Sequence, residues 1–321
     1  MRKEEIIQYV NEHATGTILS FPDRGPWGNP KYRGNFSGWI PASILVRYGC
    51  QSVSEIFAGG GTTSDLCKDL EIPYCGIDLN PNPVRADITA MDILDYNQEL
   101  PDGFYEADLQ MLHPPYPSIN DIHYSNGMWK DDKGLVNADI QEMSWEKGMH
   151  AVNQAVMRGY AAMPKGAYQA IVVGDIRRKG IFRSMLTNLT LPGEQVQILV
   201  KAQHNTVSGN RTYNNNRFFF IEHEFVVIIK KPSGYEITFI IPKHYIMDIR
   251  DSQSATWKDV VYAVLRQLGT SVSLDTIYKE IEPHKKAQGN PHWKAKVRQT
   301  LQILAQNGTV SHIAYGKWCV A

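Results

Sequence analysis

The chain has 321 residues, of which 43% are hydrophobic and 21% charged, and its 33 basic and 33 acidic residues cancel. This composition is ordinary for a soluble globular protein. No apolar run approaches the ~18–20 residues that a transmembrane helix needs, and the charged residues 1–5 lead into no apolar signal segment, so we expect a cytoplasmic protein. The four cysteines form no Cys-x-x-Cys pair, so we expect no disulfide scaffold, no structural zinc site and no other metal.

The neutral total hides an uneven distribution of charge. Residues 256–321 contain nine basic and four acidic residues, a net charge of +5, which leaves −5 on the rest of the chain. A small basic module on an acidic body favours contact with a polyanion, although a solvated charged surface has the same composition. The apolar pattern also changes near residues 252–255, so we expect two domains, over residues 1–250 and 256–321.

Short apolar strands alternate with helical stretches through the first domain. In chain order, the pattern predicts a strand at 52–57, a helix at 62–70, a strand at 74–79, a short strand within 86–93 and a strand at 105–112. A polar stretch then leads to a helix at 145–163, a buried strand at 167–174 and closing strands within 195–202 and 218–230. This alternation predicts an α/β fold with a doubly wound, mostly parallel sheet, in which ligands bind at the carboxyl ends of the strands.

A glycine-rich turn follows the first of these strands. It consists of Phe57, Ala58, Gly59, Gly60, Gly61 and Thr62. Glycines at a strand-to-helix turn let a ligand approach the backbone, and a helix N-terminus favours a negatively charged group. No Lys follows the glycines and the G-x-G-x-x-G spacing is missing, which disfavours a phosphate-binding P-loop and a dinucleotide site. Many such turns merely pack, so the turn alone does not decide the ligand.

Acidic residues after the next two strands add to the evidence. Asp78 and Leu79 end the second strand about 20 residues after the glycines, where a carboxylate can hold both ribose hydroxyls of a nucleoside. Asp92 and Ile93 follow the third strand, and Asp92 is placed to contact an adenine amino group. Asp87 and Asp95 compete with Asp92 for this role.

The glycine turn, followed by Gly76-Ile77-Asp78, resembles the S-adenosylmethionine motif of amino-group DNA methyltransferases. The resemblance covers roughly residues 21–231 and implies S-adenosylmethionine as the cofactor. It also implies a Rossmann-like, seven-stranded sheet whose last hairpin contains one antiparallel strand. Residues 172–177 are similar to the family's strand before its variable helix, and residues 221–230 to its penultimate strand region.

His113, Pro114, Pro115 and Tyr116 end the fourth strand and resemble the Asp/Asn/Ser-Pro-Pro-aromatic motif of N6-adenine and N4-cytosine methyltransferases. Consecutive prolines fix the backbone and donate no hydrogen bond, so their carbonyls can point into a pocket as acceptors. In the family, the first side chain and the first proline carbonyl take the two amine hydrogens, which turns the amine lone pair toward the methyl group. The aromatic residue, here Tyr116, stacks on a base flipped out of the double helix.

His113 departs from the Asp, Asn or Ser of the family. A neutral imidazole accepts a hydrogen bond and an imidazolium does not, so we expect activity to fall below about pH 6.5. In the family, Asp or Asn before the two prolines is found mostly in adenine methyltransferases, and Ser mostly in cytosine methyltransferases. We favour adenine N6 over cytosine N4. Cytosine C5 chemistry is disfavoured because no Pro-Cys pair supplies a thiolate nucleophile. An RNA methyltransferase and a catalytically weak DNA reader are the remaining alternatives.

Three polar loops are candidates for DNA contact, and the first is alternatively a loop that covers the methionine end of the cofactor. They span residues 24–38 with Arg33, residues 118–137 with Lys130, and residues 204–217 with Arg211. Arg and Asn side chains can read base edges, and aromatic side chains can fill the gap that a flipped base leaves. Ordinary surface loops have similar compositions.

The tail follows a pattern of three helices, at 257–268, 274–281 and 292–306, and a hairpin at 309–320. It resembles the winged-helix domains of some restriction endonucleases, which implies double-stranded DNA as a partner and a recognition helix in the major groove. Lys294, Arg298 and Gln302 share one stripe of the third helix, and His292 stands at its start. A companion restriction endonuclease is a further expected partner, while the recognition sequence and the oligomeric state are left open.

Overall fold

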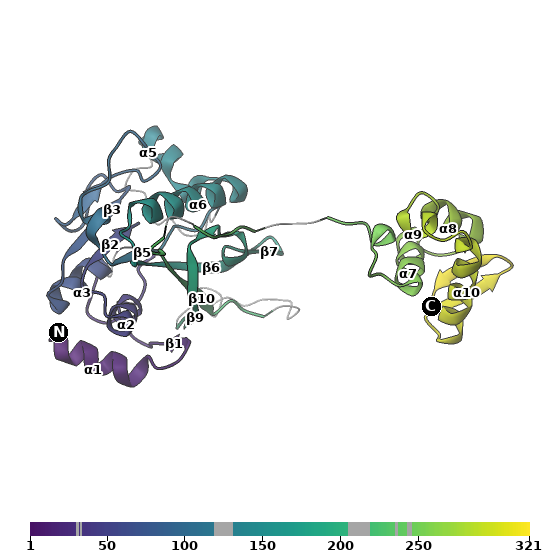
Figure 1. The fold of residues 1–321 in the computed structure, drawn as a ribbon, viewed down its shortest axis with the longest axis horizontal. Helices are drawn as coiled ribbons and strands as arrows, with labels where there is room; N and C mark the ends of the chain where they lie inside the picture. The colour runs from purple at the N-terminus through teal and green to yellow at the C-terminus, as the bar shows by residue number, and fades with distance from the viewer. Residues whose placement is uncertain (30–31, 33, 119–130, 205–218, 235–236, 243–245) are drawn as a thin grey trace. The chain divides into compact units, whose positions relative to one another are not determined.

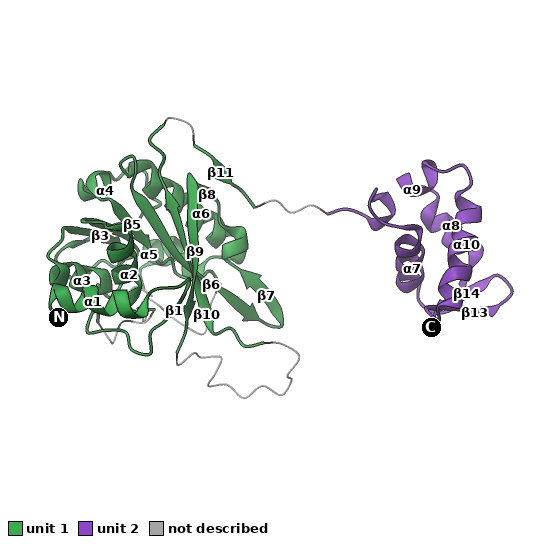
Figure 2. Ribbon diagram, turned by 60° about the horizontal axis from the view of Figure 1, so that its bottom comes forward, with its two compact units in different colours: residues 1–242 green, residues 243–321 purple. Residues whose placement is uncertain are grey.

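A computed structural model describes residues 1–29, 32, 34–118, 131–204, 219–234, 237–242 and 246–321. The chain divides into two compact units, Met1–Pro242 and Lys243–Ala321 (Figure 2). This division lies earlier than the boundary expected near residues 252–255. The reason is that a short 3-10 helix, Ile249–Asp251, binds within the second unit: Arg250 Nη1 donates to the Glu280 carbonyl at 2.7 Å, and Asp251 Oδ1 accepts from the Lys285 backbone at 3.0 Å.

A nine-stranded sheet forms the centre of the first unit (Figure 1). Its order is β1-β9-β10-β6-β5-β2-β3-β4, and β7 pairs with β6. The strands are β1 (Ile18–Ser20), β2 (Val53–Ile56), β3 (Tyr74–Asp78), β4 (Ile88–Ala90), β5 (Leu109–Leu112), β6 (Tyr168–Arg178), β7 (Ile181–Ser184), β9 (Glu194–Ala202) and β10 (His223–Lys230).

The pairing confirms the predicted doubly wound sheet. Strands β4, β3, β2, β5 and β6 are parallel neighbours, and β10 runs antiparallel to both β6 and β9. These seven strands, with one antiparallel member, are the seven that the sequence predicts. Two strands are additional: β1 pairs in parallel with the outer edge of β9, and β7 folds back on the end of β6. The strand expected at residues 105–112 is shorter, because the helix α4 (Gly103–Glu106) precedes β5.

Helices cover both faces of this sheet. On one face lie α1 (Lys3–His13), α2 (Trp39–Tyr48) and α3 (Thr62–Leu70), which bury Ile6, Ile40 and Leu66. On the other lie α4 and α6 (Trp145–Ala162), which bury Phe104 and Val152. Because both faces are covered, the central strands β2 and β5 are buried along their whole length.

Smaller elements complete the first unit. They are α5 (Lys133–Ala138), the 3-10 helices η1 (Ile140–Glu142) and η2 (Leu186–Asn188), and the paired strands β8 (Leu191–Pro192) and β11 (Phe239–Ile240). Across the described part of both units, no helix is both long enough and apolar enough to cross a membrane.

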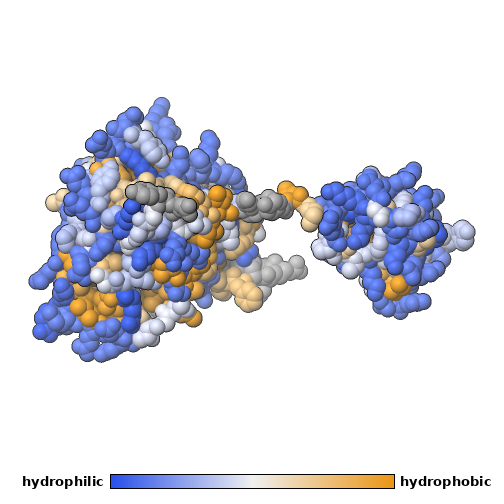
Figure 3. All heavy atoms as spheres, viewed as in Figure 1, coloured by the Kyte–Doolittle hydropathy of each residue, from blue (hydrophilic) through white to orange (hydrophobic). Residues whose placement is uncertain are grey.

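The second unit has its own core. Its elements are α7 (Trp257–Leu268), β12 (Val272–Ser273), α8 (Leu274–Ile281), α9 (Lys285–Gln288), α10 (Trp293–Gln306), β13 (Val310–Ala314) and β14 (Lys317–Val320). The strands form an antiparallel sheet in the order β12-β14-β13. Val261, Ile277 and Leu301 pack in the centre, and the face drawn in Figure 3 is mostly hydrophilic. The helices and the hairpin therefore lie where the sequence predicts them.

Candidate active site

The glycine turn carries the chain from β2 into α3 at the carboxyl edge of the sheet. Phe57, the first residue after β2, has a φ of 67°, in the left-handed region that aromatic residues rarely adopt. Gly59 (φ 47°) and Gly61 (φ 75°) take the same region at no steric cost. The strained Phe57 is held in place by its neighbour, because the Ala58 N–H donates to the Ile77 carbonyl at 3.1 Å. Backbone strain of this kind is often found at functional sites.

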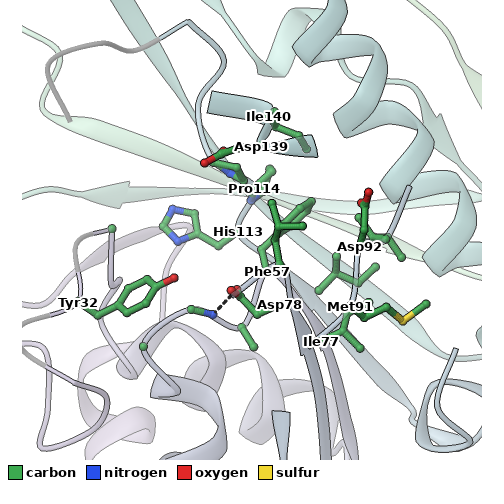
Figure 4. Close-up of a pocket in the computed structure, with 18 of the residues that line it drawn as sticks. Tyr32, Phe57, Ile77, Asp78, Met91, Asp92, His113, Pro114, Asp139 and Ile140 are labelled. Atoms are coloured by element: carbon green, nitrogen blue, oxygen red, sulfur yellow. Dashed lines mark hydrogen bonds between the residues drawn. The ribbon is translucent and has the colours of Figure 1, made fainter. Parts of the chain in front are cut away.

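One pocket connects the glycine turn with the His-Pro-Pro motif (Figure 4). The open space between its lining residues is about 930 Å³, including the solvent at its mouth. Twelve of the predicted cofactor and catalytic residues line it: Phe57, Ala58, Gly59, Gly60, Thr62, Asp78, Leu79, Asp92, Ile93, His113, Pro114 and Pro115. Gly61 and Tyr116 are not among the lining residues.

Asp78 lies against the glycine turn and is almost completely buried. Its Oδ2 accepts from the Gly59 N–H at 2.7 Å (Figure 4), and its Oδ1 accepts from the Asn80 N–H at 2.9 Å. Burial raises the pKa of Asp78, and these two backbone bonds oppose that effect. Each carboxylate oxygen can still accept a second hydrogen bond from the pocket.

Asp92 is the acid of the β4 region that reaches the pocket. Its Oδ1 accepts from the Leu94 N–H at 2.8 Å, which fixes the turn after β4. Asp87 binds Ser64 Oγ instead, and Asp95 accepts from the Asn97 backbone. Neither competitor lines the pocket, so the structure favours Asp92 among the three candidates.

The Gly/Pro/Arg-rich loop expected at residues 24–38 folds over the glycine turn. The Asn29 N–H donates to the Gly60 carbonyl at 2.9 Å, and Tyr32, Asn35 and Phe36 line the pocket. A Cβ built on Gly60 would lie 2.1 Å from Asn35 Oδ1, so only glycine allows this approach. Arg33, predicted from the same loop to contact DNA, lies outside the described residues.

Asp139 is a pocket residue that the sequence analysis missed, and Tyr32 was expected only as part of the loop at residues 24–38. Asp139 caps η1, since its Oδ1 accepts from the Gln141 N–H at 3.0 Å, and it is 6% exposed. Tyr32 points toward Asp78 (Figure 4), and burial, together with the negative charges of Asp78 and Asp139, raises its pKa. The sequence signal for Asp139 was an Asp before an apolar residue, Ile140, within a polar stretch. That pattern is too common to mark a site residue.

His113 is held between a loop residue and a sheet residue. Its ring meets Phe36 edge-on, with centroids 5.1 Å apart, and its Nε2 lies 3.8 Å from Glu224 Oε1 on β10. The imidazole is only 14% exposed. A carboxylate at this position favours the tautomer with hydrogen on Nε2, which leaves Nδ1 as an acceptor.

Tyr116, predicted to stack on a flipped base, lies outside the pocket lining. It is 9% exposed and packs in the core on the α6 side, and its hydroxyl donates to Glu224 Oε1. A Cβ built on Gly174 would lie 2.4 Å from this hydroxyl, so the glycine makes room for it. The hydroxyl bond to Glu224 holds the ring in the core.

Glu224 is the residue that joins these groups, and the sequence analysis gave it no role. It is 5% exposed, and its Oε2 accepts from Lys201 Nζ on the neighbouring strand β9. Burial alone would raise the pKa of Glu224, but the Lys201 charge and the nearby His113 ring outweigh it and hold that pKa well below its usual range. A carboxylate therefore stands behind the catalytic motif.

The remaining DNA-contact predictions fall in two groups. Lys130 and Arg211 lie outside the described residues. In the second unit, the four predicted residues His292, Lys294, Arg298 and Gln302 are exposed at the start or along the outer face of α10. Arg298 Nη1 donates to the Tyr278 hydroxyl at 2.9 Å, and Trp293 packs edge-on against Tyr278.

No family model and no curated protein matches the chain. Among solved structures, an S-adenosylmethionine-dependent methyltransferase from Archaeoglobus fulgidus overlaps with a TM-score of 0.36 at 15% identity, covering 63% of this chain and 96% of its own. The N-methyltransferase NodS from Bradyrhizobium japonicum, in complex with S-adenosyl-L-homocysteine, gives 0.35 at 14%, covering 71% and 99%. A candidate DNA modification methylase from Thermus thermophilus gives 0.28 at 15%, covering 46% and 54%. At TM-scores below 0.5, these overlaps support no inference about this chain's activity.

Proposed function

We propose that this protein is an S-adenosylmethionine-dependent DNA methyltransferase that acts on an exocyclic amino group, with adenine N6 favoured and cytosine N4 as the alternative. The observation that carries the proposal is the single pocket lined by both the glycine turn with Asp78 and the His113-Pro114-Pro115 motif. Two motifs about 50 residues apart meet at the carboxyl edge of the sheet, as the methyltransferase resemblance implies, which supports the proposal.

The pocket residues fit S-adenosylmethionine. Asp78 offers acceptors for the ribose hydroxyls, and Asp92 offers one for the adenine amino group. Apolar side chains suited to an adenine ring line the same region: Phe57, Ile77, Met91, Ile93 and Leu94. The Thr62 hydroxyl is buried in the pocket wall without a hydrogen-bond partner, as expected of a group that meets a polar ligand. When bound, the cofactor supplies an electrophilic methyl group.

The catalytic work of the chain is to orient an amine. The Pro114 carbonyl and His113 Nδ1 each accept one amine hydrogen, so the amine lone pair faces the methyl group. Glu224 Oε1 lies 3.8 Å from His113 Nε2 and favours the tautomer that carries its hydrogen on Nε2. As a neutral ring, His113 then accepts the amine hydrogen that an Asp, Asn or Ser side chain accepts in the family.

Double-stranded DNA is the proposed substrate on the strength of the second unit. Its sequence resembles winged-helix domains, and its α10 presents Lys294, Arg298 and Gln302 on one exposed face. A helix with such a stripe suits the major groove of DNA, whereas the major groove of duplex RNA is too narrow for a helix to enter. A target base inside a duplex must be flipped out before its amine reaches the pocket.

A second candidate is a DNA reader with little or no turnover. The buried, anchored Tyr116 favours it, because the ring expected to stack on the flipped base is held in the core. Such a protein would bind the cofactor and DNA and transfer no methyl group.

The test is methyl transfer from labelled S-adenosylmethionine to unmethylated duplex DNA, followed by mass spectrometry of the nucleosides. N6-methyladenine is the expected product, and N4-methylcytosine would retain the mechanism while changing the base. Asp78→Asn serves as the negative control, and we expect it to weaken cofactor binding about tenfold or more, because one ribose acceptor is lost. Cofactor binding without any product would support the reader instead.

A further inference from the structure

A basic hairpin extends from the sheet edge that carries the active site. Strand β6 is paired with β5 up to Ile171, opposite Leu112, and with β10 up to Gly174. From Asp175 to Arg178 it pairs with β7, which returns along it. Lys179 (φ 46°) and Gly180 (φ 78°) form the tight turn, with the left-handed conformations typical of two-residue hairpins. At about 3.3 Å per residue, the turn lies roughly 25 Å beyond the end of β5. Figure 2 shows β7 at the margin of the first unit.

The hairpin is strongly positive on an acidic body. Residues 177–183 contain Arg177, Arg178, Lys179 and Arg183 and no acidic residue, although residues 1–255 carry a net charge of −5. A local group of cations of this kind attracts a polyanion, although the acidic body as a whole does not. Each phosphate that a Lys or Arg neutralises releases counterions and adds to affinity for DNA.

Two exposed apolar side chains follow the turn of the hairpin. Ile181 is 56% exposed and Phe182 is 49% exposed, and the Arg177 guanidinium lies 5.5 Å from the centre of the Phe182 ring. Neither side chain belongs to the core, so neither is needed to hold the fold. Ile and Phe next to cations are the residue types that DNA-binding proteins press into a groove or between base pairs.

The base of the hairpin is firmly fixed. Ile176 and Met185 are buried in the core on the α6 side, and the Met185 N–H donates to the Gly174 carbonyl at 3.2 Å. Arg183 lies 5.8 Å from the Trp145 ring at the start of α6. A rigid attachment beside the Gly174–Tyr116 contact means that the hairpin keeps its position relative to the catalytic motif.

We propose that the β6–β7 hairpin is a DNA-contacting arm, whose cations bind backbone phosphates beside the target base and whose Ile181 and Phe182 enter the adjacent groove. The proposal rests on the proposed function, since a DNA substrate delivers its base to this edge of the sheet. That location is also why we favour duplex DNA over an anionic membrane or an acidic protein, neither of which has to meet the active-site edge.

The experiment measures the affinity of the full-length protein for a labelled, unmethylated DNA duplex across a series of salt concentrations. The charge variant is Arg177→Gln with Lys179→Gln, and the apolar variant is Ile181→Ser with Phe182→Ser. Lys165→Gln, exposed at the opposite end of β6, is the matched control. Thermal unfolding checks the fold of each variant, and Lys179→Gln alone, at an exposed turn, replaces the double variant if that one is unstable.

We expect the charge variant to bind DNA about tenfold more weakly at physiological salt, with the slope of log affinity against log salt reduced by roughly one to two. The apolar variant should lose affinity with an unchanged slope, and both should bind S-adenosylmethionine as the wild type does. Wild-type affinity and slope in both hairpin variants would overturn the proposal, as would an equal loss in Lys165→Gln.

The two proposals fail in different ways. If wild-type protein methylates DNA and the hairpin variants do so equally well, only the arm is wrong. If the hairpin variants lose DNA affinity while no variant forms methylated product, only the enzymatic function is wrong. If the wild type does not bind DNA, the DNA-contacting arm is wrong. The arm is also wrong if the hairpin variants lose as much affinity for anionic vesicles as they lose for DNA.

Discussion

Two buried glutamates have pKa values that are shifted in opposite directions. One lies near the cofactor half of the pocket, formed by the glycine turn and Asp78, and the other near the catalytic half, formed by His113 and the two prolines. Glu55 on β2 is 1% exposed and accepts hydrogen bonds from the Thr63 and Tyr74 hydroxyls, both at 2.6 Å. Burial raises the pKa of Glu55 to about 8. Glu224 on β10 is nearly as buried, but Lys201 and His113 hold its pKa far below the usual range.

Both acids are buried, so the direction of each pKa shift is decided by the side chains that contact the carboxyl group. Hydroxyl groups donate hydrogen bonds but bring no positive charge, so they only partly offset the cost of burying a carboxylate. The ammonium of Lys201 offsets it fully. Below about pH 8, the cofactor half therefore rests on a neutral acid that packs β2 against α3, whereas the catalytic half rests on an anion that faces His113.

Removing the Glu224 charge should have the largest effect on stability. Glu224→Gln leaves Lys201, which is 13% exposed, without its counter-charge. We expect the free energy of unfolding at pH 7 to fall by about 3 kcal/mol. Because the folded-state pKa is lowered, the stabilisation is present above the unfolded value near 4.3 and is lost as the pH falls through the folded pKa.

Chemical unfolding at pH 7, 5 and 3 checks this prediction. The gap between wild type and Glu224→Gln should be the same at pH 7 and pH 5 and should narrow at pH 3. A gap that closes already at pH 5 would mean that Glu224 is not an anion held by Lys201. Glu12→Gln, on the exposed face of α1, is the control for loss of a glutamate.

Glu55 should show the opposite dependence on pH. Its folded pKa of about 8 exceeds the unfolded value, so the folded state holds a proton that the unfolded state has lost. Stability therefore decreases as the pH rises from about 4.5 to 8, by on the order of 1–3 kcal/mol. Glu55→Gln mimics the protonated acid and should remove this decrease, which unfolding curves at pH 5 and pH 8 would reveal. Parallel curves for wild type and variant would contradict a neutral Glu55.

The cofactor half was easier to predict from the sequence than the catalytic half, for a physical reason. The glycine turn, Asp78 and Asp92 are local features, set by where each strand ends, so strand prediction alone places them at one edge. The same logic predicted that His113, Pro114 and Pro115 line the pocket.

The contacts of His113 and Tyr116 could not be found this way, because they depend on residues about a hundred positions away. Glu224 reaches Tyr116 and His113 only because β10 inserts between β6 and β9, and its neighbour Lys201 is fixed by the register of that hairpin. The hairpin of β6 and β7 was missed because Arg-Lys-Gly after a buried strand is equally typical of a loop that ends it.

Replacing His113 by Asp should sharpen the contrast between the halves. In the family an acidic residue is ordinary at this position, but here it would face the Glu224 carboxylate. Like-charge repulsion should lower kcat about tenfold, with the cofactor affinity unchanged because Asp78 is untouched. His113→Asn, which is neutral and can accept, should retain more activity. A gain of activity in His113→Asp would instead identify the wild type as a weakened enzyme.

The smallest expected effect belongs to Tyr116→Phe, and it decides what the ring does during turnover. The variant loses the hydroxyl bond to Glu224, so we expect the free energy of unfolding to fall by about 1 kcal/mol. Phenylalanine retains the aromatic face, so any stacking role survives the change. If the ring stays in the core during catalysis, kcat should be almost unchanged. If the ring must leave the core to stack on a flipped base, the unanchored phenylalanine should leave more readily, and kcat/KM for DNA should rise. A lower kcat/KM with normal stability would contradict both accounts, because the hydroxyl itself would then take part in the reaction.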